Sequence, residues 1–431
     1  MKPRLLVLEL WGLGDLVIAT PFLRAATEKF EVTLLAKPFA QELRPHFWPG
    51  VAVVPFSAPW TAFREKYQLW RWPWRELFAL RHRLVAQQFD FAVSARWDPR
   101  DHLALKLSGA RERLGFARLN SRRYLTRELT RPDPLAHRHE FWRVAGAALG
   151  LELPARAELF VGADSRPIGG HDDSAAGSLI PAFSPAGGEG VRRTEEGKQV
   201  QGGAALETSV QAPSSWSSPP PGEKGSEVQN PSPNLRLPSP GSASHPLPSD
   251  GRGASPRLGG AREPITEAQC PRPQPPVMLI HTGARLPLRV WPLENFAELV
   301  ARLRQKNLVV QVACDVDQLD WWRRRGENAV APRTVTELFG CLDRAGAFIG
   351  NDSGPGHLAA ACGRPTFTLF GPQLHEWFAP LHPASEVFEG KACPYKPCSD
   401  YCRFAEPFCL RGITVAEVWP RVEAFVQRHL K

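Results

Sequence analysis

The chain has 431 residues, of which 43% are hydrophobic and 43 are prolines, and its formal net charge is +9. This length accommodates two domains and an additional segment, and the apolar content is typical of a soluble globular protein. The proline content excludes a chain built entirely of packed helices and strands. The positive charge favours an acidic partner, which can be nucleic acid, an anionic membrane or a phosphorylated substrate.

The N-terminal segment is apolar enough to resemble a signal peptide. However, Glu9 and Asp15 interrupt the apolar run, and Gly12-Leu13-Gly14 predicts a turn, so we expect no signal peptide. The sequence also has no run of 18 uncharged apolar residues, so we expect no membrane-spanning helix. A chain without an export signal is expected in the cytoplasm, where its eight cysteines stay mostly reduced.

The first part of the chain alternates between strand and helix patterns. A Leu/Val-rich run at residues 4–9 is typical of a buried parallel strand. The patterns that follow predict a turn at 11–15 and helices at 16–29 and 137–150. They predict further strands at 31–36, 51–55 and 90–94. Gly12-x-Gly14 is a weak dinucleotide-binding signal because the third glycine of the fingerprint is missing.

The segment between residues 60 and 89 interleaves aromatic and basic residues. Its tryptophans alternate with arginines at Trp70, Arg71, Trp72, Trp74 and Arg75. This pattern suits a membrane interface or a phosphorylated amphiphile. It suits equally well a helix that packs its aromatic face on the sheet and turns its arginines to water.

The character of the sequence changes after residue 164. Residues 165–276 are rich in Pro, Ser and Gly, contain one Phe and one Trp, and show no sustained periodicity. Such a segment cannot bury enough apolar surface to offset its ordering entropy, so we predict a disordered insert. We therefore expect domains at 1–164 and 277–431, separated by this insert.

The part after the insert again alternates strands and helices. Its patterns predict strands at 277–281, 308–313, 347–349 and 366–370, and helices at 293–305, 338–345, 357–362 and 413–430. The same alternation on both sides of the insert indicates two doubly wound α/β domains.

The stretch AFIGNDSGPGHLAAACGRPTFTLFGP at 347–372 places polar residues where a strand ends and a helix begins. Such a helix start offers free backbone N–H groups and a positive dipole end to an anion. Asp352 and Ser353 can cap this helix. A capped turn that binds nothing is the alternative, but His357 in the first helical turn and a second turn at Gly371-Pro372 favour a binding site.

Three blocks of the chain carry one further pattern. They are LLVLELWGLGDLVIATPFLRA at 5–25, IHTGARLPLRVWPLENFAELVARL at 280–303, and TVTELFGCLDRAGAFIGNDSGPGHLAAACGRPTFTLFGP at 334–372. In this order they resemble glycosyltransferase family 9, the ADP-heptose:lipopolysaccharide heptosyltransferases. The matching motifs are Gly14-Asp15, Arg289 before Val290-Trp291-Pro292, and Asp352-Ser353-Gly354-Pro355-Gly356-His357.

The resemblance implies a GT-B fold, in which two Rossmann-like domains face a cleft, the first binding the acceptor and the second the nucleotide-sugar. It also implies an inverting transferase that needs no metal and no cofactor. Asp15 would be the general base, with Gly14 and Asp15 at the acceptor. The donor site would comprise Thr282, Gly283, Arg289, Asp352, Ser353, Gly354 and His357, with Arg289 also catalytic. In GT-B proteins the last helix often crosses back, so residues 413–430 could pack on the first domain.

Each of these assignments has an alternative. Asp15 could simply cap its helix, and Arg289 could be a solvated surface charge at a position where lysine is common in the family. The family also places an acidic residue after the strand at 308–313 to bind the sugar or ribose. Asp315 and Asp317 are both candidates for that residue, and the local pattern does not choose between them.

Four cysteines, Cys393, Cys398, Cys402 and Cys409, lie within 17 residues. Their spacing lacks the Cys-x-x-Cys pattern of a strong zinc signal, so we expect a structural loop without a bound ion. Cys314, Cys341 and Cys362 lie in apolar elements and are expected in the core.

The function expected from the resemblance is transfer of heptose from ADP-heptose to an inner-core lipopolysaccharide or lipid-linked acceptor. The expected location is the cytoplasm, with peripheral contact to the inner face of an anionic membrane, and nucleic acid is not an expected partner. Three alternatives are a related transferase with another nucleotide-sugar or acceptor, a non-catalytic binding protein of the same fold, and an NAD-dependent oxidoreductase. The missing third glycine disfavours the last of these.

Overall fold

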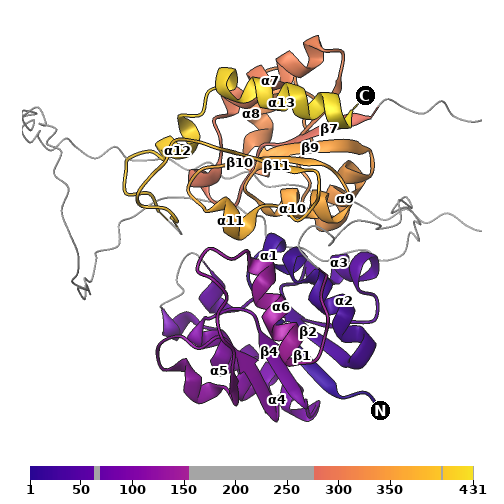
Figure 1. Cartoon of the computed structure of the whole chain (residues 1–431), viewed down its shortest axis with the longest axis vertical. Coiled ribbons are helices and arrows are strands. Elements are labelled where there is room, and N and C mark those ends of the chain that lie inside the picture. Colours follow the sequence, from indigo (N-terminus) through magenta and orange to yellow (C-terminus); the bar gives the residue numbers. More distant parts are fainter. Residues whose placement is uncertain (63–67, 155–275, 399–400, 431) are drawn as a thin grey trace, which may run out of the picture. The chain divides into compact units, whose positions relative to one another are not determined.

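The structure, a computed structural model, describes residues 1–62, 68–154, 276–398 and 401–430 (Figure 1). The predicted insert at 165–276 lies outside these residues, apart from Pro276. The described residues before and after it belong to one compact unit. None of their helices is long and apolar enough to cross a membrane.

The first sheet has six parallel strands in the order β3-β2-β1-β4-β5-β6. Their bounds are β1 Arg4–Glu9, β2 Glu31–Ala36, β3 Ala52–Pro55, β4 Phe91–Ser94, β5 Glu112–Gly115 and β6 Arg127–Glu128. Five of the six residues of β1 are buried, because β1 lies between two neighbours and is covered on both faces. This central position brings the end of β1, at Glu9, to the middle of the carboxyl edge of the sheet.

Helices cover both faces of this sheet, and we call the whole assembly the first lobe. One apolar cluster includes side chains of α1 Leu13–Ile18, α2 Thr20–Lys29, α3 Ala40–Phe47 and α6 Arg138–Ala148. A second cluster, on the other side of the strands, includes α4 Trp74–Ala86 and α5 Pro99–Leu107. Short 3₁₀ turns occupy Pro59–Thr61, Leu69–Arg71 and Leu119–Tyr124.

The predicted helix at 16–29 is two helices. α1 begins at Leu13, so the predicted turn at Gly12-Leu13-Gly14 is wrong beyond Gly12, the N-cap residue. α1 ends at Ile18 and α2 begins at Thr20, with a proline in its first turn. Pro21 has no N–H to continue the ladder of α1, which explains the break.

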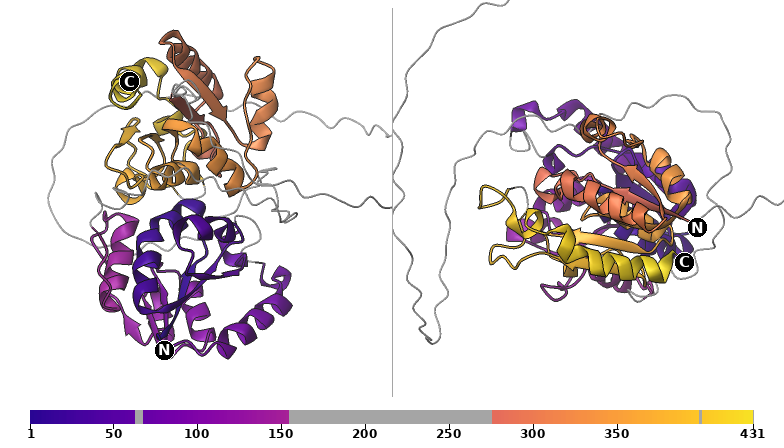
Figure 2. Two further views of the ribbon diagram at one scale, coloured as in Figure 1. Left: turned by 90° about the vertical axis from the view of Figure 1, so that its right-hand side faces the viewer. Right: turned by 90° about the horizontal axis from the view of Figure 1, so that it is seen from above.

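The second sheet has five parallel strands in the order β11-β10-β9-β7-β8, and with its helices it forms what we call the second lobe. The strands are β7 Val277–His281, β8 Val309–Ala313, β9 Ala345–Asn351, β10 Thr366–Phe370 and β11 Ser385–Glu389. The helices are α7 Leu293–Gln305, α8 Leu319–Arg323, α9 Val335–Asp343, α10 Gly354–Ala361, α11 His375–Phe378, α12 Phe408–Arg411 and α13 Val415–His429 (Figure 2). The two parallel sheets with their helices form the predicted GT-B architecture.

The last helix, α13, is anchored in the second lobe. Thr414 caps it by accepting a hydrogen bond from the Glu417 N–H at 3.3 Å, while the Glu417 carboxylate accepts one from the Thr414 N–H at 2.7 Å. Its buried side chains Val418, Val422 and Phe425 lie in one apolar cluster with α7. We expected this helix to be able to reach the first lobe. It instead contacts α7 and the strands β9, β10 and β11, because its apolar stripe covers the face of the second sheet.

Candidate functional site

The starts of two helices meet where the lobes touch. A Cβ placed on Gly14, in the first turn of α1, would lie 2.6 Å from Cδ2 of His357 in α10. A Cβ on Gly354, the first residue of α10, would lie 2.8 Å from Cβ of Leu13. Both distances are shorter than the non-bonded contacts that Cβ atoms make in proteins. Glycine at both positions therefore permits the close approach of α1 and α10. Gly14 and Gly354, which belong to two separate motifs of the sequence, are thus both required by the same contact between α1 and α10.

The carboxylate of Asp352 lies behind this contact, in the second lobe. It is buried, and its Oδ2 accepts a hydrogen bond from Arg289 Nη1 at 3.2 Å. Burial raises the pKa of Asp352, Arg289 opposes that rise, and the nearby Asp15 adds to it. Arg289 is therefore paired and not a solvated surface charge, since only 24% of its side chain is exposed.

His357 is also buried, and its environment determines its charge. Burial lowers the pKa of His357 to about 4, and Arg289 contributes in the same direction, while Asp15 opposes the change. At neutral pH the imidazole is therefore uncharged, and it can donate one hydrogen bond and accept another.

The first turn of α10 has no side-chain cap. Ser353 is the N-cap residue, but its side chain accepts no hydrogen bond from the helix, so the expected capping by Ser353 is wrong. Its extended backbone, with φ −155°, leaves the hydroxyl buried and without a hydrogen-bond partner in the described part of the chain, as is Nε of Arg289. Buried polar groups are normally satisfied, so these two atoms are suited to a polar ligand at the helix start.

In the predicted donor turn after β7, the Thr282 hydroxyl has hydrogen-bond partners within the chain, and the Gly283 backbone lies close to a carboxylate. The Thr282 hydroxyl donates to Gln318 Oε1 at 2.8 Å and accepts from Trp322 Nε1 at 3.3 Å, and no part of the residue is exposed. A Cβ on Gly283 would lie 2.3 Å from the Asp315 carboxylate. The Thr282 side chain thus holds the strand ends together, while the Gly283 backbone lies directly against a carboxylate.

The two acidic candidates after β8 have different environments. Asp315 lies at this turn, where burial raises its pKa while His281 and a hydrogen bond from the Ala284 backbone lower it. Asp317 is exposed on the 3₁₀ turn Val316–Gln318. Only Asp315 faces the predicted donor turn.

Asp15 takes part in two interactions in the first lobe. Its Oδ2 accepts a hydrogen bond from the Gly12 N–H at 3.1 Å, which stabilises the start of α1. Its Oδ1 pairs with Nη2 of Arg96. Stabilisation of the helix start, which we considered as the alternative to a catalytic role for Asp15, therefore uses only Oδ2. The Asp15 side chain is 20% exposed.

Three residues that the sequence did not identify surround Asp15. Glu9 ends β1, Arg96 follows β4 and Asp101 lies in the first turn of α5, so all three come from the carboxyl edge of the first sheet. The Arg96 guanidinium lies 5.1 Å from the ring centroid of Trp11. Asp101 accepts hydrogen bonds from the indole N–H groups of Trp60 at 2.8 Å and Trp11 at 3.2 Å. Of these three residues, only Glu9 could have been noticed in the sequence, because it is an acidic residue at the end of an otherwise apolar strand.

The electrostatics of this cluster are dominated by burial. Burial raises the pKa of Glu9 to about 8 and that of Asp101 to about 6. The Coulombic effect of Arg96 lowers both, whereas the negative charge of Asp15 raises that of Glu9. Glu9 is thus largely protonated at neutral pH. The Arg96 guanidinium interacts electrostatically with all three carboxyl groups, those of Glu9, Asp15 and Asp101.

The burial of Glu9 predicts a pH-dependent stability. Its ordinary pKa is 4.5 and its pKa in the folded chain is about 8. Between these values the unfolded chain has lost a proton that the folded chain keeps, so the free energy of unfolding falls as pH rises, by at most about 1.4 kcal/mol per pH unit. We expect Glu9→Gln to remove this fall, so that the variant gains stability relative to the wild type from pH 5 to pH 8 in urea unfolding.

The control for this experiment is Glu31→Gln, which changes the formal charge equally at an exposed position on the neighbouring strand β2. A difference between Glu9→Gln and wild type that stays constant from pH 5 to pH 8 would show that Glu9 does not titrate in this range.

Cations border the cluster from both lobes. Burial and the charge of Arg285 lower the pKa of Lys37 to about 8. Arg285 Nη2 donates to the carbonyl of Thr61 at 3.4 Å. Arg138, at the start of α6, has its guanidinium carbon 4.0 Å from the ring centroid of Trp97 and 4.9 Å from that of Trp377 in the second lobe. Its burial lowers its pKa to about 9, so it still carries its charge at neutral pH. The site therefore combines a cluster of carboxyl groups with a basic border, and such a border attracts anionic ligands.

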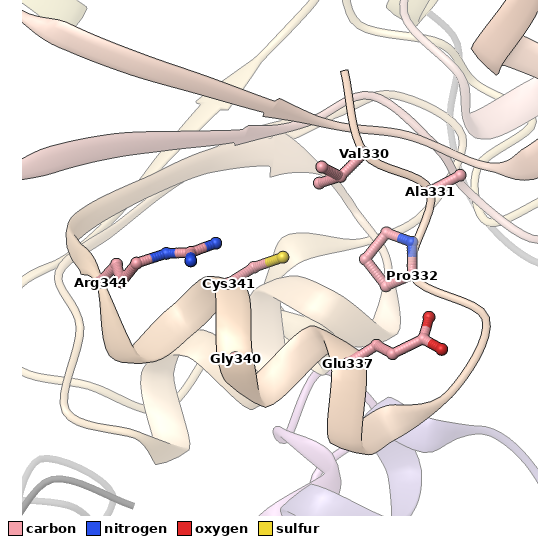
Figure 3. Close-up of a pocket in the computed structure, with 7 residues that line it drawn as sticks. All are labelled: Val330, Ala331, Pro332, Glu337, Gly340, Cys341 and Arg344. Carbon is pink, nitrogen blue, oxygen red and sulfur yellow. The ribbon is translucent and has the colours of Figure 1, made fainter. Parts of the chain in front are cut away.

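The cysteines do not form a metal centre in the described residues, where no group of three or more potential ligands is arranged to hold an ion. Cys314 and Cys341 are buried, as expected, and Cys362 is half-buried. A hollow of about 290 Å³ at α9 is lined by Val330, Ala331, Pro332, Glu337, Gly340, Cys341 and Arg344 (Figure 3). None of the predicted site residues lines it.

Comparisons with known proteins bear on this site. Residues 255–407 match the model of glycosyltransferase family 9 (heptosyltransferase). The chain is 32% identical over 113 residues to lipopolysaccharide heptosyltransferase 3 of Escherichia coli K12, and 30% identical over 143 residues to lipopolysaccharide heptosyltransferase 1 of Pseudomonas aeruginosa. The matches cover 24% and 32% of this chain, and they span only 33% and 39% of those two relatives.

Solved structures extend the likeness of fold to nearly the whole chain. The E. coli heptosyltransferase WaaC with ADP aligns over 98% of this chain and 99% of its own, with a TM-score of 0.57 and 15% identity. A family 9 glycosyltransferase from Veillonella parvula aligns over 99% and 98%, with a TM-score of 0.58 and 14% identity. The family match, which spans Arg289, Asp352 and His357, confirms the predicted resemblance of this part of the chain to glycosyltransferase family 9, and the solved structures show that the chain shares the GT-B fold.

Proposed function

We propose that this protein is an inverting, metal-independent glycosyltransferase that transfers heptose from ADP-heptose to the inner core of a lipopolysaccharide acceptor. The observation that carries the proposal is the meeting of α1 and α10. It brings Asp15 of the first lobe into the electrostatic field of Asp352 and His357 in the second. A carboxylate is thus placed against a helix start that has a half-buried arginine, Arg289, beside it.

The second lobe would bind the donor. When the bond between the anomeric carbon and the diphosphate oxygen breaks, the electron pair moves onto the departing ADP. Arg289 and the N–H groups at the start of α10 supply preorganised positive charge for that diphosphate. A guanidinium and backbone amides can do the work for which other transferases use a divalent cation.

The contacts of the donor turn refine the predicted residue roles. We assign the sugar or ribose contact to Asp315, because it lies against Gly283 whereas Asp317 is exposed. Gly283, Ser353, Gly354 and His357 remain donor-site residues. The Thr282 side chain, whose partners are internal, positions the turn instead of contacting the donor.

The first lobe would supply the base. The acceptor hydroxyl attacks the anomeric carbon from the face opposite the departing ADP, and its proton moves to a carboxylate oxygen of Asp15. Gly14, beside Asp15, allows the acceptor and donor sides to approach closely. Arg96 holds Asp15 in place and is a positioning residue, and the basic border at Lys37 and Arg138 suits an acceptor rich in anionic groups. Such an acceptor is held at the cytoplasmic face of a membrane.

The donor is tested by thermal shift with a panel of nucleotides and nucleotide-sugars. We expect ADP and ADP-heptose to raise the melting temperature more than UDP- or GDP-sugars, because a ligand stabilises by RT ln(1 + [L]/Kd). A preference for UDP- or GDP-sugars would instead indicate a related transferase with another donor. A protein that binds ADP-heptose but releases no ADP in the presence of acceptor would be a non-catalytic binding protein.

A further inference from the structure

The first lobe exposes a row of large apolar side chains outside the proposed site. Leu69 and Trp70 of the 3₁₀ turn Leu69–Arg71 are 53% and 77% exposed, and Trp74 and Phe78 of α4 are 45% and 60% exposed. Single exposed apolar residues are ordinary, but four of them within ten positions form a contiguous candidate surface. We call these four residues the aromatic ridge.

Internal contacts hold the ridge in place. The indole N–H of Trp74 donates to the carbonyl of Leu69 at 2.8 Å. A series of ring contacts at 5.7–6.4 Å between centroids runs from the core to the surface through Phe56, Trp60, Trp72, Trp74 and Phe78. On the other side of α4, Leu80 and Leu84 are buried against the sheet. Binding by the ridge therefore requires little further ordering of its rings, which favours association.

Basic side chains flank the ridge. Trp74, Phe78, Arg81 and Val85 follow one face of α4 at spacings of four, three and four residues, and all are exposed. The exposed basic residues of this segment are Arg71, Arg75, Arg81, His82 and Arg83, against one acidic residue within α4, Glu76. An exposed apolar stripe bordered by arginines is complementary to an anionic lipid surface, in which rings enter the interface and guanidinium groups meet phosphates.

The position of the ridge agrees with the proposed acceptor site. α4 connects the parallel strands β3 and β4, so it runs antiparallel to them and its first turn lies at their carboxyl edge. The proposed base also lies at that edge. Trp60, one of the rings behind the ridge, donates its indole N–H to Asp101 in the carboxylate cluster.

We propose that the aromatic ridge and its arginines dock the first lobe onto an anionic bilayer, so that a membrane-held acceptor reaches the carboxyl edge of the sheet. This inference rests on the proposed function for its biological purpose, but the docking itself requires neither donor nor acceptor. The two proposals can therefore be told apart: the protein could transfer the sugar without binding vesicles, or bind vesicles without transferring the sugar.

The test is flotation of the full chain with vesicles of phosphatidylethanolamine and phosphatidylglycerol, compared with phosphatidylcholine alone, in the absence of sugar nucleotides. We expect binding to the anionic vesicles that weakens as salt is raised to about 0.5 M, because salt screens exposed charges. The variant Trp70→Ser/Trp74→Ser/Phe78→Ser should lose at least tenfold in partition, and Arg75→Glu/Arg81→Glu should lose binding selectively to the anionic vesicles.

The matched control is Val309→Ser/Val316→Ser, which removes two exposed apolar side chains from the second lobe and should bind as the wild type does. Circular dichroism and the ADP thermal shift confirm that each variant is folded. Equal binding of the ridge variant and the wild type would overturn the proposal. So would a wild-type dimer in sedimentation that the ridge variant loses, because the ridge would then contact a second copy of the chain.

Discussion

Replacing Asp15 with asparagine is expected to lower kcat by about 10²–10⁴-fold, the usual contribution of a positioned general base. The amide oxygen can still accept the hydrogen bond from Gly12, so α1 should keep its start and the chain its fold. The loss should appear in kcat and leave the melting-temperature shift with ADP unchanged, because the residues that we propose to bind the donor lie in the second lobe. ADP release with donor and acceptor, measured under saturating conditions, gives kcat directly.

A suitable control is Asp133→Asn. Its carboxylate also accepts a backbone hydrogen bond, from Leu135 N–H at 2.8 Å, but Asp133 is exposed. It is not among the groups that shift the pKa of Glu9, Arg96 or Asp101. This variant should retain wild-type kcat. If Asp15→Asn turned over at the wild-type rate, Asp15 would be a helix-stabilising residue only.

The second large effect is expected at Arg289. Arg289→Ala removes the guanidinium that the mechanism directs at the departing diphosphate, and a lost electrostatic donor of this kind costs about 10²–10³-fold in rate. It also leaves Asp352 buried without its cation, which destabilises the start of α10, where we propose that the donor binds. We therefore expect kcat/KM and the ADP-induced thermal shift to fall together.

Two further variants separate these effects. Arg289→Lys keeps the charge without the planar fork of donors and should retain part of the activity. Arg289→Ala/Asp352→Asn removes the unpaired charge, so it should recover stability but not turnover. Arg302→Ala serves as the control: its pairing with Glu298 on α7 is a surface ion pair that contributes about 0–1 kcal/mol. Activity of Arg289→Ala equal to that of this control would exclude a catalytic role for Arg289.

The carboxylate cluster adds a constraint that the proposed mechanism must accommodate. Glu9, Asp15 and Asp101 all lie in the field of Arg96, and burial raises the pKa of two of them. Protonation of Glu9 reduces the number of negative charges that compete for Arg96. Arg96 is then available to hold the carboxylate that we assign as the base, Asp15.

Local sequence patterns determined the alternation of strands and helices, the family motifs and eight of the eleven strands of the two sheets, but they missed β5, β6 and β11. Buried parallel strands such as β1 and β9 are continuous apolar runs, and the motifs at Asp15, Arg289 and Asp352 are short and contiguous, so each is visible without its neighbours. Helix boundaries were less accurate. The break between α1 and α2 depends on one proline, and the Ser353 cap depends on a side-chain orientation that the residue type does not reveal.

Only the tertiary structure decided which residues share the site. Glu9, Arg96 and Asp101 come from three separated segments, and their altered pKa values arise from burial, which a linear pattern does not contain. The choice between Asp315 and Asp317 likewise depends on which carboxylate lies against Gly283. The Trp/Arg segment shows the same limit: its sequence fitted a packed face and an exposed one equally, and the fold buries Trp60 while exposing Trp70 and Trp74. Residue types determine what each side chain can do, but the solvent and charges around it depend on the packing of distant segments.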